Sequence, residues 1–239
     1  MTVCDWGLLE EDWDALGTWA DGDTNGAVSS ISPAGELYLD CRAMSALGVA
    51  RRSKDIGTIG TGDYTIYMRF KGDTWDGNQS TNTDGIKLYI QAGDQAIVVI
   101  IGNQVDGSND GIWVYDGGAY NRVVTKTWDG NFHTIRLDVH NSQTDVDIYI
   151  DDEESPSATD ADCSFATTTD GATQLTGYGT IAGNGEYHID YVKINSGNCD
   201  PTESGPAGVK TINGLAIASV KTIQQTAIAN VKTINNSAV

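Results

Sequence analysis

Apolar and polar residues alternate along much of the chain between residues 36 and 194. In the run 64–70, for instance, every second residue is Tyr, Ile, Met or Phe. A period of two residues is the pattern of a β-strand that buries one face. The pattern predicts eight strands, at 36–41, 64–70, 85–90, 96–101, 112–115, 132–139, 146–150 and 187–194.

Glycine, aspartate and asparagine fill nearly all of the connections between these runs, as at 60–63 and 107–111. These residues favour turns over helix interiors. No segment before residue 205 keeps an apolar stripe at helical spacing over three turns. We therefore predict an all-β fold, a two-sheet antiparallel sandwich.

The composition changes at 198–208, a segment that holds two of the chain's four prolines. An eleven-residue unit follows it, beginning with Val-Lys-Thr-Ile at residue 209, recurring at 220 and recurring in truncated form at 231. The predicted organisation is a sandwich over 1–197, a Pro/Gly linker over 198–208 and a repeat tail over 209–239.

The repeat has three possible conformations. Its β-branched residues and the Asn213-Gly214 pair favour short hairpins. An eleven-residue apolar period also suits a right-handed coiled coil, and a chain end can lack structure altogether. A folded unit of this size needs copies of itself or a partner to stack on, so the tail is predicted to drive assembly. The candidate assembly residues are Val209, Ile212, Val220, Ile223, Val231 and Ile234.

The charge of the chain is −19, from 33 acidic and 14 basic residues. Three of the basic residues and none of the acidic ones lie in the tail, so the charge is about −22 before it and +3 within it. This balance excludes a general nucleic-acid binder and argues against an anionic membrane surface. The N-terminus shows no signal peptide, and the longest apolar run, 96–101, is too short to span a bilayer.

Four cysteines are widely spaced, and none belongs to a CxxC pair. A zinc ribbon or a thioredoxin-type site is therefore not expected. Cys4 and Cys199 bracket the predicted sandwich, whose terminal strands can lie side by side, so a disulfide between them is one alternative. Four unpaired apolar thiols are the other, in keeping with the absence of a visible signal peptide.

No motif for catalysis is present: HExxH, GxSxG and GxxxxGK[ST] are all missing. The chain also lacks the Glu-x-Asp-x-x-Glu strand expected of sandwich-fold glucanases and the Arg, Gln and His strand motifs of sandwich-fold alginate lyases. His133 and His188 fall within predicted strands, where a structural role is expected. We therefore predict that the protein is not an enzyme.

Two acidic loops could hold calcium, because carboxylate and amide oxygens on Gly-rich loops are the ligands that it prefers. Neither loop has EF-hand spacing, and aspartate and asparagine also stabilise turns by bonding their own backbone. The candidate calcium ligands are Asp73, Asp76, Asp84, Asp106, Asn109 and Asp110.

Aromatic side chains beside Asp and Asn in loops can stack on sugar rings while the polar neighbours bond the hydroxyls. The candidate glycan-binding residues are Trp75, Trp113, Tyr115 and Tyr120. Packing in the core is the alternative role, predicted for Trp128 and for one of Trp113 and Tyr115.

The run 128–137, which reads Trp-Asp-Gly-Asn-Phe-His-Thr-Ile-Arg-Leu, resembles a strand of the concanavalin A-like or laminin-G-like jelly roll. The run 146–152 and the closing strand 186–194 resemble two further strands of that family. The resemblance implies a two-sheet antiparallel jelly roll, often calcium-bearing and often glycan- or protein-binding, whose last strand returns beside the first. Asp152 stands where the family usually has glycine, so the turn there is expected to differ.

The tail resembles short repeats at the ends of bacteriophage virion proteins. Together the two resemblances imply a virion surface protein, a decoration or fibre subunit, that assembles as a homo-oligomer or on other virion proteins through its tail. Surface glycans are then possible ligands of the sandwich. The alternatives are an extracellular carbohydrate-binding module of a bacterium, a polysaccharide-degrading enzyme and a structural sandwich without a ligand.

Overall fold

The computed structural model describes residues 4, 6–42, 48–56, 62–74, 85–92, 95–103, 110–163, 165–166, 172–179, 185–201 and six dipeptides of the tail. By its contacts the chain divides into two units. One is Trp6–Asn198, and the other joins Met1–Asp5 to Cys199–Val239. None of the described segments forms a helix with the length and apolarity that crossing a bilayer requires.

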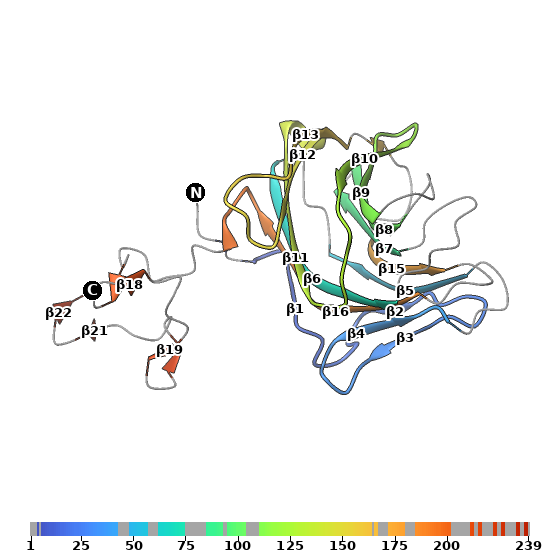
Figure 1. The fold of residues 1–239 in the computed structure, drawn as a ribbon, viewed down its shortest axis with the longest axis horizontal. Coiled ribbons are helices and arrows are strands. Elements are labelled where there is room, and N and C mark those ends of the chain that lie inside the picture. Colours follow the sequence, from blue (N-terminus) through green and yellow to red (C-terminus); the bar gives the residue numbers. More distant parts are fainter. Residues whose placement is uncertain are drawn as a thin grey trace. The chain divides into compact units, whose positions relative to one another are not determined.

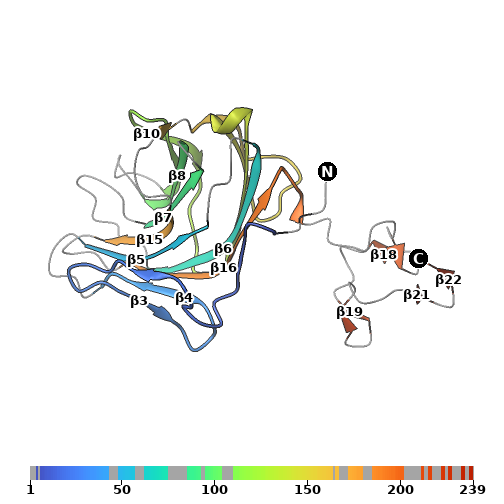
Figure 2. The same cartoon turned by 180° about the vertical axis from the view of Figure 1, so that it is seen from behind.

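Two antiparallel sheets form the unit Trp6–Asn198, and they pack face to face (Figure 1). In the described residues the first sheet runs β13-β12-β11-β6-β16-β4-β3, with β1 also paired to β16. Figure 2 shows β3 and β4 beside β16 and β6 at one edge of this sheet. Its strands are β1 (Leu9–Glu11), β3 (Val28–Ile31), β4 (Leu37–Asp40), β6 (Tyr64–Thr74), β11 (His133–His140), β12 (Asp145–Ile150), β13 (Ala158–Asp162) and β16 (Glu186–Ser196).

The second sheet runs β10-β9-β8-β7-β15-β5-β2, with β14 also paired to β8. A short 3₁₀ helix, η1 (Asn141–Gln143), connects β11 to β12 of the first sheet. The strands of the second sheet are β2 (Ala20–Asp21), β5 (Gly48–Asp55), β7 (Gly85–Ala92), β8 (Gln95–Asn103), β9 (Asp110–Tyr115), β10 (Tyr120–Thr125), β14 (Phe165–Ala166) and β15 (Ala172–Gly179). The two-sheet antiparallel sandwich predicted from the sequence is confirmed, and each of the eight predicted strands lies within or overlaps an observed one.

The core lies between the sheets and is built by alternate residues of each strand. On β6, Ile66, Met68 and Phe70 are fully buried, and on β7 the same is true of Leu88 and Ile90. Burying one aliphatic or aromatic side chain of this size stabilises the fold by about 1.5–3 kcal/mol. These two rows therefore contribute substantially to the free energy of unfolding of the unit. The predicted core position of Trp128 is confirmed, since its indole packs edge-on against Phe70.

One of Trp113 and Tyr115 is buried, as expected, but alternation between the two residues is not the reason. Residues two apart on a strand share a face, and on β9 it is Ile112 and Val114 that join the core. Trp113 and Tyr115 therefore both point away from it. Trp113 is nevertheless only 2% exposed, as is Val98 on the neighbouring strand.

The turn that follows β12 and leads toward β13 holds Asp152 where the resembling family usually has glycine. Asp151 and Asp152 have φ of +54° and +59°, and Glu153 donates its backbone N–H to Ile150 O at 3.2 Å. Left-handed backbone at two successive residues characterises a two-residue hairpin turn, for which aspartate is tolerated.

Side-chain hydrogen bonds hold this turn to the adjacent strand. The Asp151 carboxylate accepts from the Thr134 backbone N–H at 3.2 Å and from Lys126 at 3.0 Å, and it faces His133 Nδ1 at 3.0 Å. The other ring nitrogen of His133 lies 3.0 Å from Asp129 Oδ1. His133 thus has the structural role expected of it, as a brace between two aspartates.

In the tail the eleven-residue period reappears as three short hairpins. β17 (Thr211–Ile212) pairs with β18 (Leu215–Ala216), β19 (Thr222–Ile223) with β20 (Thr226–Ala227), and β21 (Thr233–Ile234) with β22 (Ser237–Ala238). The first residue of each hairpin pairs with its last, so the three registers are equivalent. Of the three conformations considered, the described tail residues adopt the β form.

Cys4 and Cys199 form a disulfide, with their Cα atoms 5.2 Å apart. Of the two alternatives left by the sequence, the clasp is therefore the one that the structure contains. Cys41 and Cys163 form no disulfide and are fully buried. Burial, together with the nearby carboxylates of Asp145 and Asp162, raises the pKa of the Cys163 thiol to about 12.

Thiol titration should distinguish these two pairs of cysteines. The native protein is expected to react very slowly with Ellman's reagent at pH 8, because buried neutral thiols are poor nucleophiles. In denaturant without reductant two thiols should react, and after reduction four. Four reactive thiols before reduction would contradict the disulfide. Reduction should also lower the free energy of unfolding by about 2–5 kcal/mol, measured by urea denaturation.

The Asp151 brace predicts a pH dependence of stability. Burial opposes ionisation of Asp151, but the contacts with His133 and Lys126 outweigh it, so the pKa of this carboxyl group lies below its usual value. Such a group stabilises the fold above its unfolded-state pKa of about 3.9, and this stabilisation disappears as the pH falls through the lower folded-state pKa.

Asp151→Asn should therefore lower the Tm by about 2–4 °C at pH 7, since a partly exposed ion pair contributes up to about 1 kcal/mol. At pH 2 the Tm values of the variant and the wild type should converge. Asp14→Asn, at an exposed position, serves as the control and should show neither effect. A Tm difference that persists at pH 2 would show that the loss is not electrostatic.

Candidate functional site

A polar cluster occupies the face of the first sheet that points away from the core. It forms because β4, β6 and β16 alternate there in register: His188 pairs with Tyr38 of β4 and with Lys71 of β6. The residues between these, such as Leu39 and Tyr187, are fully buried in the core. The cluster is made up of Glu36, Tyr38, Asp40, Arg42, Lys71, Asp73, Glu186 and His188.

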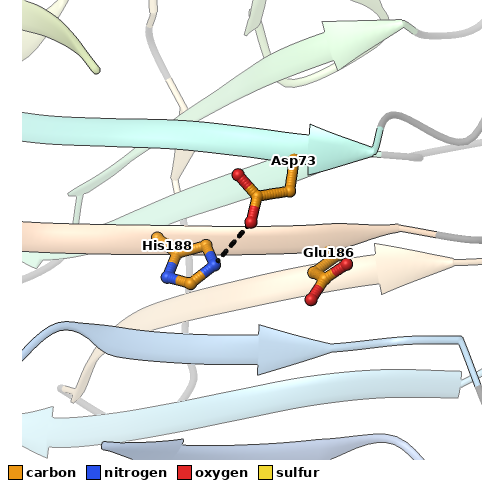
Figure 3. A group of neighbouring side chains, drawn as sticks. All are labelled: Asp73, Glu186 and His188. Carbon is orange, nitrogen blue, oxygen red and sulfur yellow. Dashed lines mark ion pairs between the residues drawn. The ribbon is translucent and has the colours of Figure 1, made fainter. Parts of the chain in front are cut away.

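His188 is the centre of this cluster. Its Nδ1 lies 2.7 Å from Glu36 Oε2, and its Nε2 lies 3.2 Å from Asp73 Oδ2. The imidazole is only 10% exposed, and its ring packs against that of Tyr38 with centroids 4.9 Å apart. Figure 3 shows Asp73 directed at the ring from β6, with Glu186 beside it on the same strand as His188.

Each carboxylate of the cluster has a second partner that fixes its orientation. Arg42 donates to Glu186 Oε2 at 3.0 Å and to Asp40 Oδ2 at 2.9 Å, and the Tyr38 hydroxyl donates to Glu186 Oε1. Lys71 Nζ lies 3.0 Å from Asp73 Oδ1. The four acids and two bases leave two negative charges over a small area.

These contacts shift the pKa values within the cluster. Partial burial and the bond to Glu186 raise the pKa of the Tyr38 hydroxyl. Hydrogen bonds from Arg42 lower the pKa of Asp40. Burial opposes ionisation of Asp73, but Lys71 and His188 outweigh it and keep its pKa below the usual value. Asp40 and Asp73 therefore stay ionised at neutral pH, and the phenol of Tyr38 stays neutral.

A second candidate region is the β9–β10 hairpin, where Tyr115 and Tyr120 are paired residues. The centroids of the two rings lie 4.8 Å apart, the ring planes are inclined at 43°, and both side chains are half-buried. Asp116 accepts from the backbone N–H groups of Gly118 and Ala119 at 2.8 and 2.7 Å, which lowers its pKa. The loop thus presents two adjacent tyrosine rings on a turn with a fixed conformation.

Few of the residues proposed from the sequence fall in these two regions. Tyr115 and Tyr120 come together as a pair. Asp73 lies in the polar cluster, and the indole of Trp113 is only 2% exposed. Trp75, Asp76, Asp84, Asp106 and Asn109 lie outside the described residues, as does the side chain of Asp110.

The sequence pattern does not single out Glu36, Tyr38 or Glu186, and it predicts only a structural role for His188. The signal available was their alternation with apolar residues, which places them on one face of each strand. Nothing in the sequence shows that β4 and β16, some 150 residues apart, are neighbours. The polar cluster therefore depends on the order of the strands in the sheet, which the local sequence pattern does not reveal.

Comparisons with known proteins show the fold. No protein-family model matches the chain, and no curated protein matches it either. Among solved structures it is similar to a carbohydrate esterase from the Shiga toxin-encoding bacteriophage phi24B, with a TM-score of 0.56 and 14% identity over 80% of this chain and 98% of that one. It is also similar to a putative β-glucanase from Mycobacterium abscessus, with a TM-score of 0.50 and 15% identity over 78% and 99%. The fold is a concanavalin A-like jelly-roll sandwich, which hosts both enzymes and binding modules.

Proposed function

We propose that the protein is a non-enzymatic component of a virion surface, a decoration or fibre subunit that displays a lectin-like sandwich. In this proposal the C-terminal repeats assemble the protein, with copies of itself or with other virion proteins. The observation that supports this proposal most directly is the tail, whose three hairpins repeat one register every eleven residues.

The size of these hairpins supports assembly. Each has two residues per strand, and isolated hairpins are at best marginally stable in water. Their edges offer unpaired backbone groups to a neighbouring strand. Equivalent repeats from several chains can satisfy these groups by stacking, which is how repeat architectures gain their stability.

The strongly acidic sandwich supports a role in display. A charge of about −22 before the tail keeps such domains apart at high local concentration. The small basic tail lacks this repulsion. The same chain therefore combines a segment suited to assembly with a domain suited to solvent.

The described residues of the second sheet favour binding over hydrolysis. On the face of β7, β8, β9 and β15 that points away from the core, no described side chain is a carboxylate, whereas hydrolysis of a glycoside commonly needs two. Val98, Ile100 and Trp113 on that face are buried and apolar. The half-exposed Tyr115–Tyr120 pair is therefore our proposed contact for a sugar ring.

Substitutions in the tail test the assembly role. Ile212→Asp, Ile223→Asp and Ile234→Asp combined in the full chain should abolish self-association, because charged residues at three equivalent apolar positions cannot be buried against a neighbour. Light scattering after size exclusion measures the mass. The matched control combines Thr211→Asp, Thr222→Asp and Thr233→Asp, which add the same charge one position away in each repeat. It should lose less of the self-association.

The Tm of the sandwich should be unchanged in both tail variants. If the wild type is a monomer that fails to incorporate into particles, the virion proposal is wrong. A monomer that binds glycans would then indicate the extracellular carbohydrate-binding module instead.

A glycan array followed by titration calorimetry tests the sandwich. Tyr115→Ala and Tyr120→Ala should each weaken binding of a retained glycan by about tenfold, the loss expected from one aromatic stacking contact. Tyr191→Ala, which removes a half-buried ring from the first sheet, is the control and should bind normally. Loss of binding in the control alone would place the sugar on the other sheet, and turnover of the glycan would refute the non-enzymatic assignment.

A further inference from the structure

A three-residue donor set lies within the polar cluster of the first sheet. One side-chain atom from each of Asp73, Glu186 and His188 lies within 4.8 Å of the other two. Figure 3 shows the three side chains meeting on one side of the sheet. Acidic clusters on protein surfaces are common, so the geometry of the histidine is what distinguishes this one.

His188 Nε2 is buried and has no hydrogen-bond partner among the described residues. Asp73 Oδ2 lies 3.2 Å from it, and the two groups attract each other when the ring is protonated. Leaving a buried ring nitrogen without a well-aligned hydrogen bond costs about 1–3 kcal/mol. A metal ion between this nitrogen and the carboxylate would replace the missing bond.

The tautomer of His188 follows from its other nitrogen. Nδ1 lies 2.7 Å from the Glu36 carboxylate, which can only accept, so Nδ1 carries the hydrogen. In a neutral imidazole the lone pair is then on Nε2 and faces Asp73 and Glu186. A carboxylate that accepts from the second nitrogen of a histidine is the usual arrangement behind a metal-bound imidazole.

The remaining contacts suit a cation as well. Asp73 uses Oδ1 for Lys71 and presents Oδ2 to His188, so one edge of the carboxylate is available. Arg42 and Tyr38 orient Glu186 by donating to its two oxygens, Oε2 and Oε1 respectively. The cluster carries two uncompensated negative charges, which one divalent cation would neutralise.

We propose that Asp73, Glu186 and His188 bind a divalent transition-metal ion, with zinc as the best fit, and that Glu36 orients the imidazole. One nitrogen and two carboxylate oxygens form a donor set that zinc accepts, with a fourth position left for water, whereas calcium prefers six to eight oxygens. The proposal is independent of the proposed function, because it concerns the opposite sheet from the tyrosine pair.

Metal binding is tested on the full chain without a polyhistidine tag, after dialysis against a chelator. Calorimetric titration with zinc should give one equivalent per chain, and zinc at about 100 times its Kd should raise the Tm by about 5–10 °C. His188→Gln and Asp73→Asn should remove the one-equivalent binding. Asp73 is exposed, so its substitution leaves the fold intact.

Two further variants sharpen the test. Glu36→Gln should weaken zinc binding by about 10–100-fold without removing a ligand. His140→Gln is the matched control, since His140 also faces two carboxylates, Asp147 at 3.3 Å and Asp160 at 3.7 Å, but Asp160 is largely exposed. Its zinc affinity should equal that of the wild type.

The proposal is overturned if zinc does not bind with one equivalent, if His188→Gln leaves binding unchanged, or if His140→Gln reduces it equally. Calcium binding without zinc binding would also overturn it, because the buried imidazole would then have no role as a ligand. An unchanged affinity in Glu36→Gln would remove Glu36 from the assignment.

Discussion

The pairing of β16 with β6 is the constraint on which the rest of the sandwich depends. The ladder runs from Glu186 to Ser196, and β4 and β1 complete the other edge of β16. A bulge at Asp190 interrupts the register between Ile189 and Tyr191. Before the bulge the odd-numbered residues face the core, and after it the even-numbered ones do, as the full burial of Tyr187, Ile189, Val192 and Ile194 shows. One inserted residue thus lets both halves of the strand keep an apolar face inward while Glu186 and His188 remain outside.

Much of the fold could be predicted from the sequence, and β15 and β5, two of the strands that were not predicted, show a physical reason for the failure. In β15 the core-facing positions include Leu175 and Gly177, and a Cβ at Gly177 would lie 2.9 Å from Leu39 and 3.0 Å from Tyr187. In β5 a core-facing position is Arg52, which is 8% exposed and donates to Ser29 O at 2.7 Å. Neither strand shows an apolar alternation. In β15 neighbouring strands supply the bulk, and in β5 the Arg52 guanidinium is held by a backbone carbonyl and by the carboxylate of Asp21 at 3.7 Å. Residues on neighbouring strands therefore determine that β5 and β15 form. These neighbours are distant in the sequence, so the local pattern does not reveal them.

The abundance of aspartate has a similar explanation in the described residues. Asp23 accepts from Ser29 N and Oγ and from Arg51 N, and Asp116, Asp129 and Asp151 bond turn residues or basic side chains. Such bonds lower the pKa values of Asp116, Asp129 and Asp151, so these charges belong to the architecture of the loops. The polar cluster is different in kind. Its members come from three strands and from the residues on either side of β4, and composition alone could not separate them from the acids that stabilise turns.

The disulfide between Cys4 and Cys199 has a mechanical consequence. It closes a covalent loop between cysteines with a sequence separation of 195, and this loop contains every strand of the sandwich. A pulling force applied between the N-terminus and the repeat tail passes through the sulfur–sulfur bond and bypasses the hydrogen-bonded ladders. Tension along the chain therefore cannot peel β1 from β16 or unravel the jelly roll strand by strand. In oxidising surroundings the tail can bear load while the domain next to it stays unstretched.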